Sequence, residues 1–255
     1  MLEARELTLA WGDGREVVRD VSLRVATGET VCIVGRSGSG KTTLLHALAG
    51  LTHPRSGSVF LDEKDITGEP GHIGYMFQKD LLLTSKTVLD NVCLPLVLRG
   101  VSHEQAREKA LPLLERFGLG EVASRWPSQL SGGMRQRAAF ARTYLMGSSA
   151  LLLDEPFSAL DALTRTEMRE WFLSVTGELG LTVVMVSHDP DEALLIADRV
   201  VVLVGNPAQG HPATLAGEID VLSLKTASSC REGQTFELSS DFLEAKKELL
   251  ELLGD

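Results

Sequence analysis

The sequence has few cysteines, and they form no recognisable pattern. Its 255 residues contain three of them, Cys32, Cys93 and Cys230, which lie far apart and include no C-x-x-C pair. This spacing gives neither a disulfide framework nor a zinc site, and it suits a reducing compartment such as the cytoplasm. We interpret each cysteine as a small, buried or partly buried apolar residue.

Long apolar runs and an excess of positive charge are also missing. The apolar stretch at 193–205 carries Asp198 and Arg199 in its middle, and no uncharged run is long enough to span a bilayer. Residues 1–11 have charges where a signal peptide would have its apolar stretch. The net charge is -10, so no nucleic-acid partner is expected. The sequence predicts a protein that is not integral to a membrane but can dock onto one.

Strand and helix patterns alternate along most of the chain. Short β segments are expected at 6–11, 17–25 and 57–66, buried strands at 30–34, 150–156, 182–188 and 199–204, and helices at 41–50, 163–179 and 191–197. Within the longest of these helices, Leu163, Met168, Trp171, Phe172, Val175 and Leu179 are expected to form one apolar stripe. Strands that alternate with helices predict an α/β fold with a mainly parallel, buried sheet.

The middle third of the chain has a different, mostly helical pattern. Ser102 and Gln105 have the spacing of a capping box, which predicts the start of a helix. Pro112 lies inside that helical run and is expected to kink or end it. Ser131 is placed to begin a second helix. We interpret residues 79–149 as an inserted helical lobe.

The domain organisation follows from these patterns. Residues 1–78 together with 150–205 are predicted to form an α/β core, 79–149 the helical lobe, and 206–255 a C-terminal extension, all within one domain spanning 1–255. The extension begins in a looser stretch and ends in an amphipathic helix at 241–253 that is expected to pack on the body of the domain.

The stretch GRSGSGKT fits the phosphate-loop pattern G-x-x-x-x-G-K-[ST] between a buried strand and a helix. Its glycines allow backbone N–H groups to converge on phosphate oxygens, Lys41 should reach the β- and γ-phosphates, and Thr42 should ligate Mg²⁺. The alternative, a glycine-rich turn with a surface lysine, does not explain the strand and helix on either side. The residues expected to bind nucleotide here are Gly35, Arg36, Ser37, Gly38, Ser39, Gly40, Lys41, Thr42 and Thr43.

The segment LLLDEP supplies carboxylates for the same site. Asp154 ends an apolar strand, where its carboxylate can approach Mg²⁺ beside Thr42. Glu155 follows directly and can polarise the water that attacks the γ-phosphorus. An isolated Asp-Glu pair is usually a solvated loop, but this pair follows a buried strand in a chain with a phosphate loop. We therefore expect ATP and Mg²⁺ as cofactors.

A second glycine-rich stretch, LSGGMRQR at 130–137, opens a predicted helix and also has the character of an anion site. With GRSGSGKT, LSGGMRQR, LLLDEP, SALD and SH in this order, the chain resembles the ATPase subunit of ABC transporters from about Glu3 to at least Val204. The resemblance implies a P-loop NTPase (RecA-like) core with a mainly parallel sheet, an N-terminal antiparallel β subdomain and an inserted α-helical lobe that carries the signature.

The resemblance also implies roles for single residues. Gln78 matches the glutamine that joins the Mg²⁺ and water shell and links the core to the lobe, and His188 matches the histidine that contacts the γ-phosphate. Asp161 in SALD matches the loop that communicates across a dimer. Trp11 lies where an aromatic ring stacks on adenine, although a core or edge tryptophan is the alternative interpretation.

Members of this family pair head to tail, which gives the second anion site a role. Ser131, Gly132 and Gly133 are then expected to hold the γ-phosphate that the partner subunit's Lys41 binds, so that two identical composite sites form. ATP is expected to close the dimer and hydrolysis to open it.

The resemblance favours an importer that energises uptake of nitrate, taurine, sulfonates or pyrimidine precursors of thiamine. Thr84, Ser85 and Lys86 depart from the branch pattern in the segment expected to face a membrane permease. The expected partners are a second copy, permease subunits and, indirectly, a substrate-binding protein, at the inner face of the cell membrane. The alternatives are a separate-chain exporter ATPase, a soluble ABC ATPase acting on DNA or ribosomes, and a P-loop small-molecule kinase.

Overall fold

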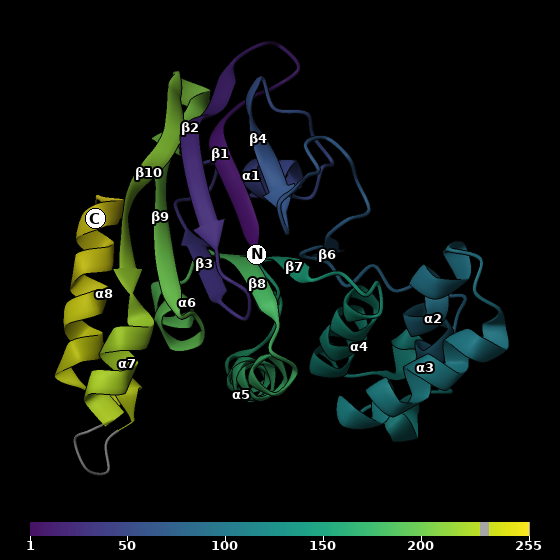
Figure 1. Ribbon diagram of the computed structural model, residues 1–255. Helices are drawn as coiled ribbons and strands as arrows, with labels where there is room; N and C mark the ends of the chain where they lie inside the picture. Colours follow the sequence, from purple (N-terminus) through teal and green to yellow (C-terminus); the bar gives the residue numbers. More distant parts are fainter. Residues whose placement is uncertain (230–234, 255) are drawn as a thin grey trace.

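The computed structural model describes residues 1–229 and 235–254, which fold around one ten-stranded sheet (Figure 1). The strand order is β5-β4-β1-β2-β10-β9-β3-β8-β7-β6. The strands are β1 (Leu2–Ala10), β2 (Glu16–Val25), β3 (Thr30–Val34), β4 (Ser56–Leu61), β5 (Lys64–Asp65), β6 (Gly74–Met76), β7 (Ala150–Asp154), β8 (Thr182–Ser187), β9 (Arg199–Asn206) and β10 (His211–Asp220).

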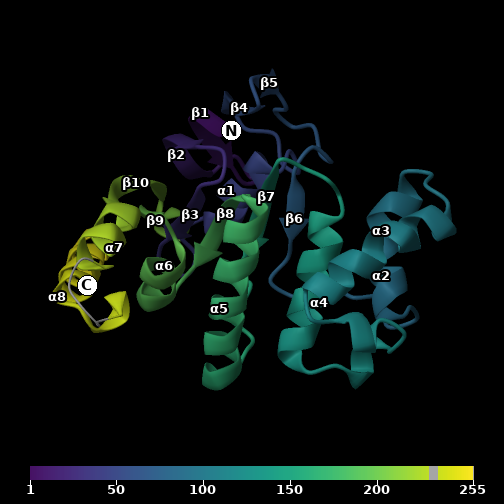
Figure 2. The ribbon, with the colours of Figure 1, turned by 60° about the horizontal axis from the view of Figure 1, so that its bottom comes forward.

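Helices lie on both sides of the sheet and beyond one edge (Figures 1 and 2). They are α1 (Lys41–Leu48), α2 (Val88–Leu98), α3 (His103–Arg116), α4 (Gly132–Tyr144), α5 (Ala162–Leu179), α6 (Pro190–Ile196), α7 (Val221–Ser229) and α8 (Ser240–Leu253), with the short 3₁₀ turns η1 (Gly120–Val122), η2 (Pro127–Gln129), η3 (Pro207–Gln209) and η4 (Phe236–Leu238). Both views place α2, α3 and α4 at one end of the molecule and α7 and α8 at the other. Within the described ranges, no helix combines the length and apolar character needed to cross a bilayer.

The sheet has a parallel part and an antiparallel part, which confirms the predicted fold class. β3 pairs in parallel with β8 and β9, and β7 pairs in parallel with β8 and β6. β1 pairs antiparallel with β2 and β4. The strands β3, β7 and β8 are buried at every position, as their continuous apolar sequences predict for the centre of a parallel sheet.

The buried residues form two apolar clusters, one on each face of the sheet. Along β3, Val31 and Ile33 belong to one cluster with the apolar side of α1, whereas Cys32 and Val34 belong to the other with the helical lobe and α5. This division follows from the two-residue period of a strand. Cys32 and Cys93 are buried and free, as predicted, and Cys230 lies outside the described residues.

The chain after Gly205 was expected to be loose, and for the first part of the extension this expectation is wrong. β10 pairs antiparallel with β9 and pairs in parallel with β2 at Ala213–Val18, so it joins the two parts of the sheet. The strand has a weak sequence pattern, because Ala213 and Ile219 are its only buried residues. Its backbone pairs with β9 from His211 to Asp220, and such pairing does not require an alternating apolar pattern in the sequence.

The helical lobe departs from the sequence prediction in two places. Ser102 accepts a hydrogen bond from the Gln105 backbone N–H at 3.3 Å, as its capping role predicts. The expectation that the helix could end at Pro112 is wrong, because α3 runs through Pro112 to Arg116. Pro112 has no backbone N–H to donate to the carbonyl of Glu108, four residues earlier. Both residues are exposed, so water can form a hydrogen bond with that carbonyl. The lobe also contains α2, which the sequence pattern did not predict.

The predicted stripe on α5 is correct except at its start. Met168, Phe172 and Val175 are buried, but Leu163 is 81% exposed. Leu163 lies in the first turn of the helix, directly after the loop that carries Asp161. A large apolar side chain is therefore presented to solvent beside a predicted dimer contact.

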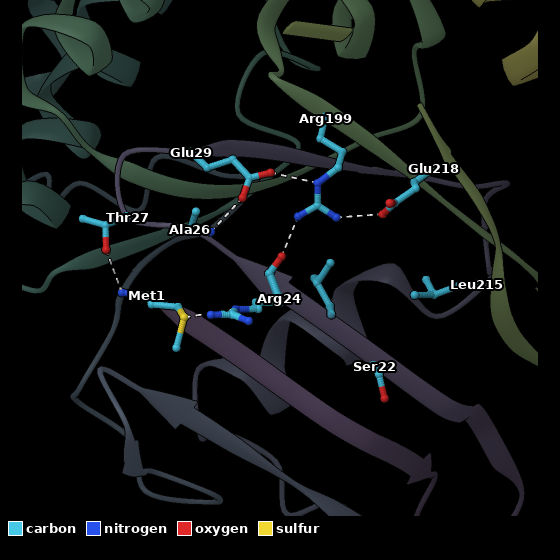
Figure 3. Close-up of a pocket in the computed structure, with 10 residues that line it drawn as sticks. Met1, Ser22, Arg24, Ala26, Thr27, Glu29, Arg199, Leu215 and Glu218 are labelled. Carbon is cyan, nitrogen blue, oxygen red and sulfur yellow. Dashed lines mark hydrogen bonds and ion pairs between the residues drawn. The ribbon is translucent and has the colours of Figure 1, made fainter. Parts of the chain in front are cut away.

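The two charges inside the apolar run at 193–205 are structural. Arg199 begins β9 and forms ion pairs with Glu29 at 2.8 Å and Glu218 at 2.7 Å, and it also donates to the Arg24 carbonyl (Figure 3). Asp198 accepts a hydrogen bond from the Thr30 backbone N–H at 2.8 Å. These contacts tie the start of β9 to its neighbours, at the opposite end of the parallel strands from the phosphate loop.

Candidate nucleotide-binding site

The phosphate loop turns from β3 into α1 in a space that only glycine fits. A Cβ atom on Gly35 would lie 2.4 Å from the carbonyl oxygen of Leu203. Gly40 has a φ of +98°, and a Cβ there would lie 2.8 Å from Val17. Backbone strain and close packing therefore require glycine at both positions. The loop is held in shape by the core of its own chain.

Lys41 sits inside this loop. Its Nζ donates to the carbonyl oxygens of Gly35 at 2.7 Å and Arg36 at 3.0 Å. Desolvation lowers the pKa of Lys41, while the negative charges of Glu155 and Asp154 oppose that shift. The hydroxyl of Ser39 is buried and has no hydrogen-bond partner among the described residues. A partly desolvated cation and an orphaned hydroxyl in a glycine-rich loop fit a phosphate group.

Thr42 and Asp154 lie side by side, as predicted. The Thr42 hydroxyl donates to Asp154 Oδ1 at 3.2 Å. Asp154 is 7% exposed, and burial raises its pKa, whereas hydrogen bonds from Thr42 and Tyr75 lower it. A hydroxyl and a buried carboxylate are hard oxygen donors of the kind that Mg²⁺ prefers alongside phosphate oxygens. These two residues therefore fit the expected metal.

Glu155 brings together the other predicted catalytic residues. Its Oε2 accepts a hydrogen bond from Gln78 at 3.1 Å and lies 3.1 Å from His188 Nδ1. Glu155 itself has a φ of +45°, which is rare for a residue with a side chain and stores strain at this turn. Gln78 contacts Glu155 and Ser158 rather than Thr42 or Asp154, so its place in a metal shell stays a prediction.

The signature residues lie at the start of α4 and pack on the loop that follows β7. Ser131 caps the helix by accepting a hydrogen bond from the Met134 backbone N–H at 3.3 Å. Asp161 caps α5 in the same way through the Thr164 backbone N–H at 3.1 Å. A Cβ on Gly132 would lie 3.1 Å from Leu160. The signature and the Asp161 loop therefore form one surface of the chain.

Ser131, Gly132 and Gly133 on this surface do not line the cavity at the phosphate loop, although Gln136 of the same stretch lines an adjoining cavity that shares Gln78, Glu155 and His188 with it. The phosphate-loop cavity has a volume of about 690 Å³. Its lining consists of Val34, Gly35, Arg36, Ser37, Gln78, Glu155, His188, Pro190, Leu250 and Leu253. No signature residue belongs to this lining. Within one copy, the two glycine-rich stretches thus do not share the cavity.

Trp11 lies in the turn after β1 and is 36% exposed. The guanidinium of Arg15 lies 5.0 Å from the centre of its ring, which leaves it as a surface aromatic rather than a core residue. Its contact with adenine stays a prediction.

Two parts of the site were not found from the sequence. Tyr75 on β6 donates from its hydroxyl to Asp154 Oδ2 at 3.2 Å. The end of α8 also reaches the phosphate loop, where Arg36 donates to the Gly254 carbonyl at 2.8 Å. The only sequence signal for Tyr75 was its position three residues before Gln78, and the amphipathic pattern of α8 predicted packing without naming its partner.

A phosphate loop with an acidic strand end beside it places the chain in the class of P-loop nucleotide-binding ATPase cassettes. The family model described as ABC transporter matches residues 18–158, which is more than half of the chain. The chain belongs to the ABC transporter family, as its signature predicted.

Curated relatives and a solved structure agree with this assignment. The sulfate/thiosulfate import ATP-binding protein CysA of Synechococcus elongatus is 43% identical over 78% of this chain, which spans 61% of that relative's length. The formylaminopyrimidine import ATP-binding protein ThiZ of Halalkalibacterium halodurans is 40% identical over 82% of each chain. The dimeric ATP-binding cassette MJ0796, solved in a post-hydrolysis state with ADP and Pi, is 31% identical with a TM-score of 0.72, covering 87% of this chain and 99% of its own.

Proposed function

We propose that this chain is the ATP-hydrolysing, energy-coupling subunit of an ABC importer. The observation that carries the proposal is the Glu155 carboxylate, held between Gln78 and His188 at the edge of the phosphate-loop cavity. A carboxylate in this position can accept a proton from an attacking water. The His188 imidazole and the Gln78 amide would orient the carboxylate and the water. The import function is supported by relatives that are named import ATP-binding proteins.

The remaining residues of the cavity bind and orient the nucleotide. Lys41 neutralises phosphate charge from within the loop, and the backbone N–H groups of the loop donate to phosphate oxygens. Thr42 and Asp154 would hold Mg²⁺, which supplies charge neutralisation between the β- and γ-phosphates when bound. Gln78 and His188 fix the side chain of Glu155, so that its orientation is set before ATP arrives.

The active form is a head-to-tail dimer. The signature lies outside the cavity of its own chain, although its helix N-terminus is suited to an anion. The cassette MJ0796 is described as dimeric, and the exposed Leu163 beside Asp161 offers an apolar contact on the same surface as the signature. ATP then closes the dimer by contacting both copies, and hydrolysis opens it.

The segment after Gln78 is the docking place for the permease, at the inner face of the cell membrane. Leu81 and Leu83 in this segment are 51% and 41% exposed, and Phe77, directly before Gln78, is 42% exposed, so the segment and its start present an apolar surface. Arg142 on α4 donates to the Leu81 carbonyl at 2.7 Å, so movement of this segment is transmitted to the helix that carries the signature. The cargo is a small anion, a sulfonate or a thiamine-precursor-like molecule, delivered by a substrate-binding protein.

Replacing Glu155 with glutamine tests the catalytic core of this proposal. We expect ATP turnover to fall by about 100-fold or more, because glutamine cannot act as a general base. An ATP-dependent dimer should accumulate and be visible by size-exclusion chromatography. Glu170→Gln, on the exposed face of α5, is the matched control and should hydrolyse normally. Wild-type turnover in Glu155→Gln would remove Glu155 as the base.

Transport is tested in cells that express the chain with its permease. Uptake of sulfate, an alkanesulfonate and a thiamine pyrimidine precursor is compared between the wild type and Glu155→Gln. We expect one of the three to depend on an active Glu155. If uptake of none of them depends on it, the proposed cargo class is wrong.

A further inference from the structure

Tyr75 is the feature of the site to which nothing above gives a role. It lies on β6, opposite Leu152 of the parallel strand β7. Leu152 and Asp154 share one face of β7, because side chains alternate along a strand. The Tyr75 side chain therefore runs toward the carboxyl end of the sheet, where its hydroxyl donates to Asp154 Oδ2 at 3.2 Å.

The carboxylate of Asp154 is thereby fixed at both oxygens. Thr42 faces Oδ1 and Tyr75 faces Oδ2, each at 3.2 Å. Asp154 is 7% exposed, so little water is available to replace either donor. If one oxygen of this buried carboxylate had no hydrogen bond, its desolvation would destabilise the folded chain. The carboxylate could also rotate about its terminal torsion.

The ring of Tyr75 is held in place from two sides. Its centroid lies 4.6 Å from the Phe77 ring and 5.5 Å from the His46 ring. The hydroxyl at the end of this ring donates to Asp154 Oδ2 at 3.2 Å. A phenol whose ring is packed in this way is well suited to hold one carboxylate oxygen in a fixed direction.

We propose that Tyr75 is a positioning residue for the metal-binding carboxylate: its hydroxyl holds Asp154 Oδ2 so that Oδ1 points toward Thr42 and the metal. The inference rests on the proposed use of ATP with Mg²⁺. Tyr75 should therefore affect the part of nucleotide binding that depends on the metal, but not the binding of phosphate by the phosphate loop itself.

The test compares Tyr75→Phe with the wild type in nucleotide binding by the isolated chain. The affinity for ATP is measured with excess Mg²⁺ and with excess EDTA, and Mn²⁺ binding to the ATP complex is followed by electron paramagnetic resonance. We expect Tyr75→Phe to reduce the metal-dependent gain in ATP affinity by about tenfold, the effect of one lost hydrogen bond to a charged group. Binding in EDTA should stay within about twofold, since no loop contact is changed.

The chain provides a matched control in its second tyrosine. Tyr144 lies in the helical lobe, and the centre of its ring is 6.2 Å from the centre of the Phe117 ring. Its hydroxyl makes no hydrogen bond within the described ranges. Tyr144→Phe should change neither measurement. Combining Tyr75→Phe with Asp154→Asn provides a second test, because the tyrosine should have no further effect once the carboxylate is gone.

The outcomes separate this inference from the proposed function. An equal loss of affinity with and without metal, or no loss at all, would overturn the positioning role of Tyr75. So would a full Tyr75→Phe effect in the Asp154→Asn background. If the wild type bound ATP equally well with Mg²⁺ and EDTA, the proposed Mg²⁺ site itself would fail, whatever Tyr75 does.

Discussion

The two glycine-rich stretches look alike in sequence but have different relations to their surroundings. In the phosphate loop, a Cβ atom on Gly35 would lie 2.4 Å from a backbone oxygen of the same chain, and Gly40 has a φ of +98°. In the signature, Gly132 and Gly133 have ordinary helical backbone, and a Cβ on either would meet side chains at 3.1 Å. The fold requires glycine in the first case and only permits it in the second. Glycine without a backbone requirement also allows a ligand or another backbone to approach closely, which is the role predicted for the signature.

The largest expected effect separates the two stretches by function. Ser131→Arg places a long cation at the start of α4, where it would obstruct a second copy. We expect hydrolysis to fall by about 100-fold, the cost of losing an anion-stabilising group in a transition state. ATP binding to the isolated chain, measured by fluorescence of a labelled nucleotide, should stay within about twofold. Loss of that binding would mean that the signature acts on the nucleotide of its own chain.

A smaller effect on folding separates the glycines themselves. Gly35→Ala forces the Leu203 carbonyl to move, and we expect a loss of about 2 kcal/mol in the free energy of unfolding. Gly132→Ala meets only the flexible end of Leu160 at 3.1 Å and gains helix propensity, so its effect should be below about 0.5 kcal/mol. Urea denaturation of the nucleotide-free chain measures both. Equal losses would contradict the distinction drawn between the two loops.

The smallest expected effect is a difference in stability between variants of two acidic residues, Asp154 beside the phosphate loop and Asp161 beside the signature. Burial raises the pKa of Asp154, so its contribution to stability declines as pH rises through that pKa, and the charged form is unfavourable at pH 7. Hydrogen bonds from Thr164 lower the pKa of Asp161, whose stabilising contribution is present at pH 7 and is lost as pH falls. Asp154→Asn should therefore raise the stability of the nucleotide-free chain at pH 7 by roughly 1 kcal/mol.

Thermal unfolding at pH 7 checks this contrast, with Asp161→Asn as the paired variant. The Asp161→Asn substitution should leave the melting temperature unchanged or lower it slightly, because asparagine also caps helices. A lower melting temperature for Asp154→Asn would show that the metal-site carboxylate is not held at a cost in the folded chain.

Local sequence pattern was sufficient for the motifs and for the strands that carry them. The continuous apolar runs of β3, β7 and β8 predicted buried parallel strands, and the residues that follow each run were correctly placed at one edge of the sheet. Thr42 and Asp154 were expected to meet and do so at 3.2 Å. These predictions succeeded because a short strand that is apolar on both faces fits few positions other than the centre of a covered sheet.

Features that depend on contacts between distant segments were missed. The strand β10 has too few buried residues for a clear pattern, and its pairing with β9 is a backbone property. Leu163 fits an apolar stripe by spacing, yet its side chain is 81% exposed. Spacing along a helix defines a face, but only the neighbouring elements decide how much of that face is covered.

Short, contiguous motifs were enough to predict that the chain binds nucleotide through GRSGSGKT and belongs to the class that pairs this loop with a signature, because those functions reside in neighbouring residues. Only the folded chain shows that Tyr75 reaches Asp154, 79 residues away, and that Arg36 meets Gly254 across 218 residues. Such contacts arise from the packing of whole strands and helices, and no local pattern encodes which side chains that packing brings together.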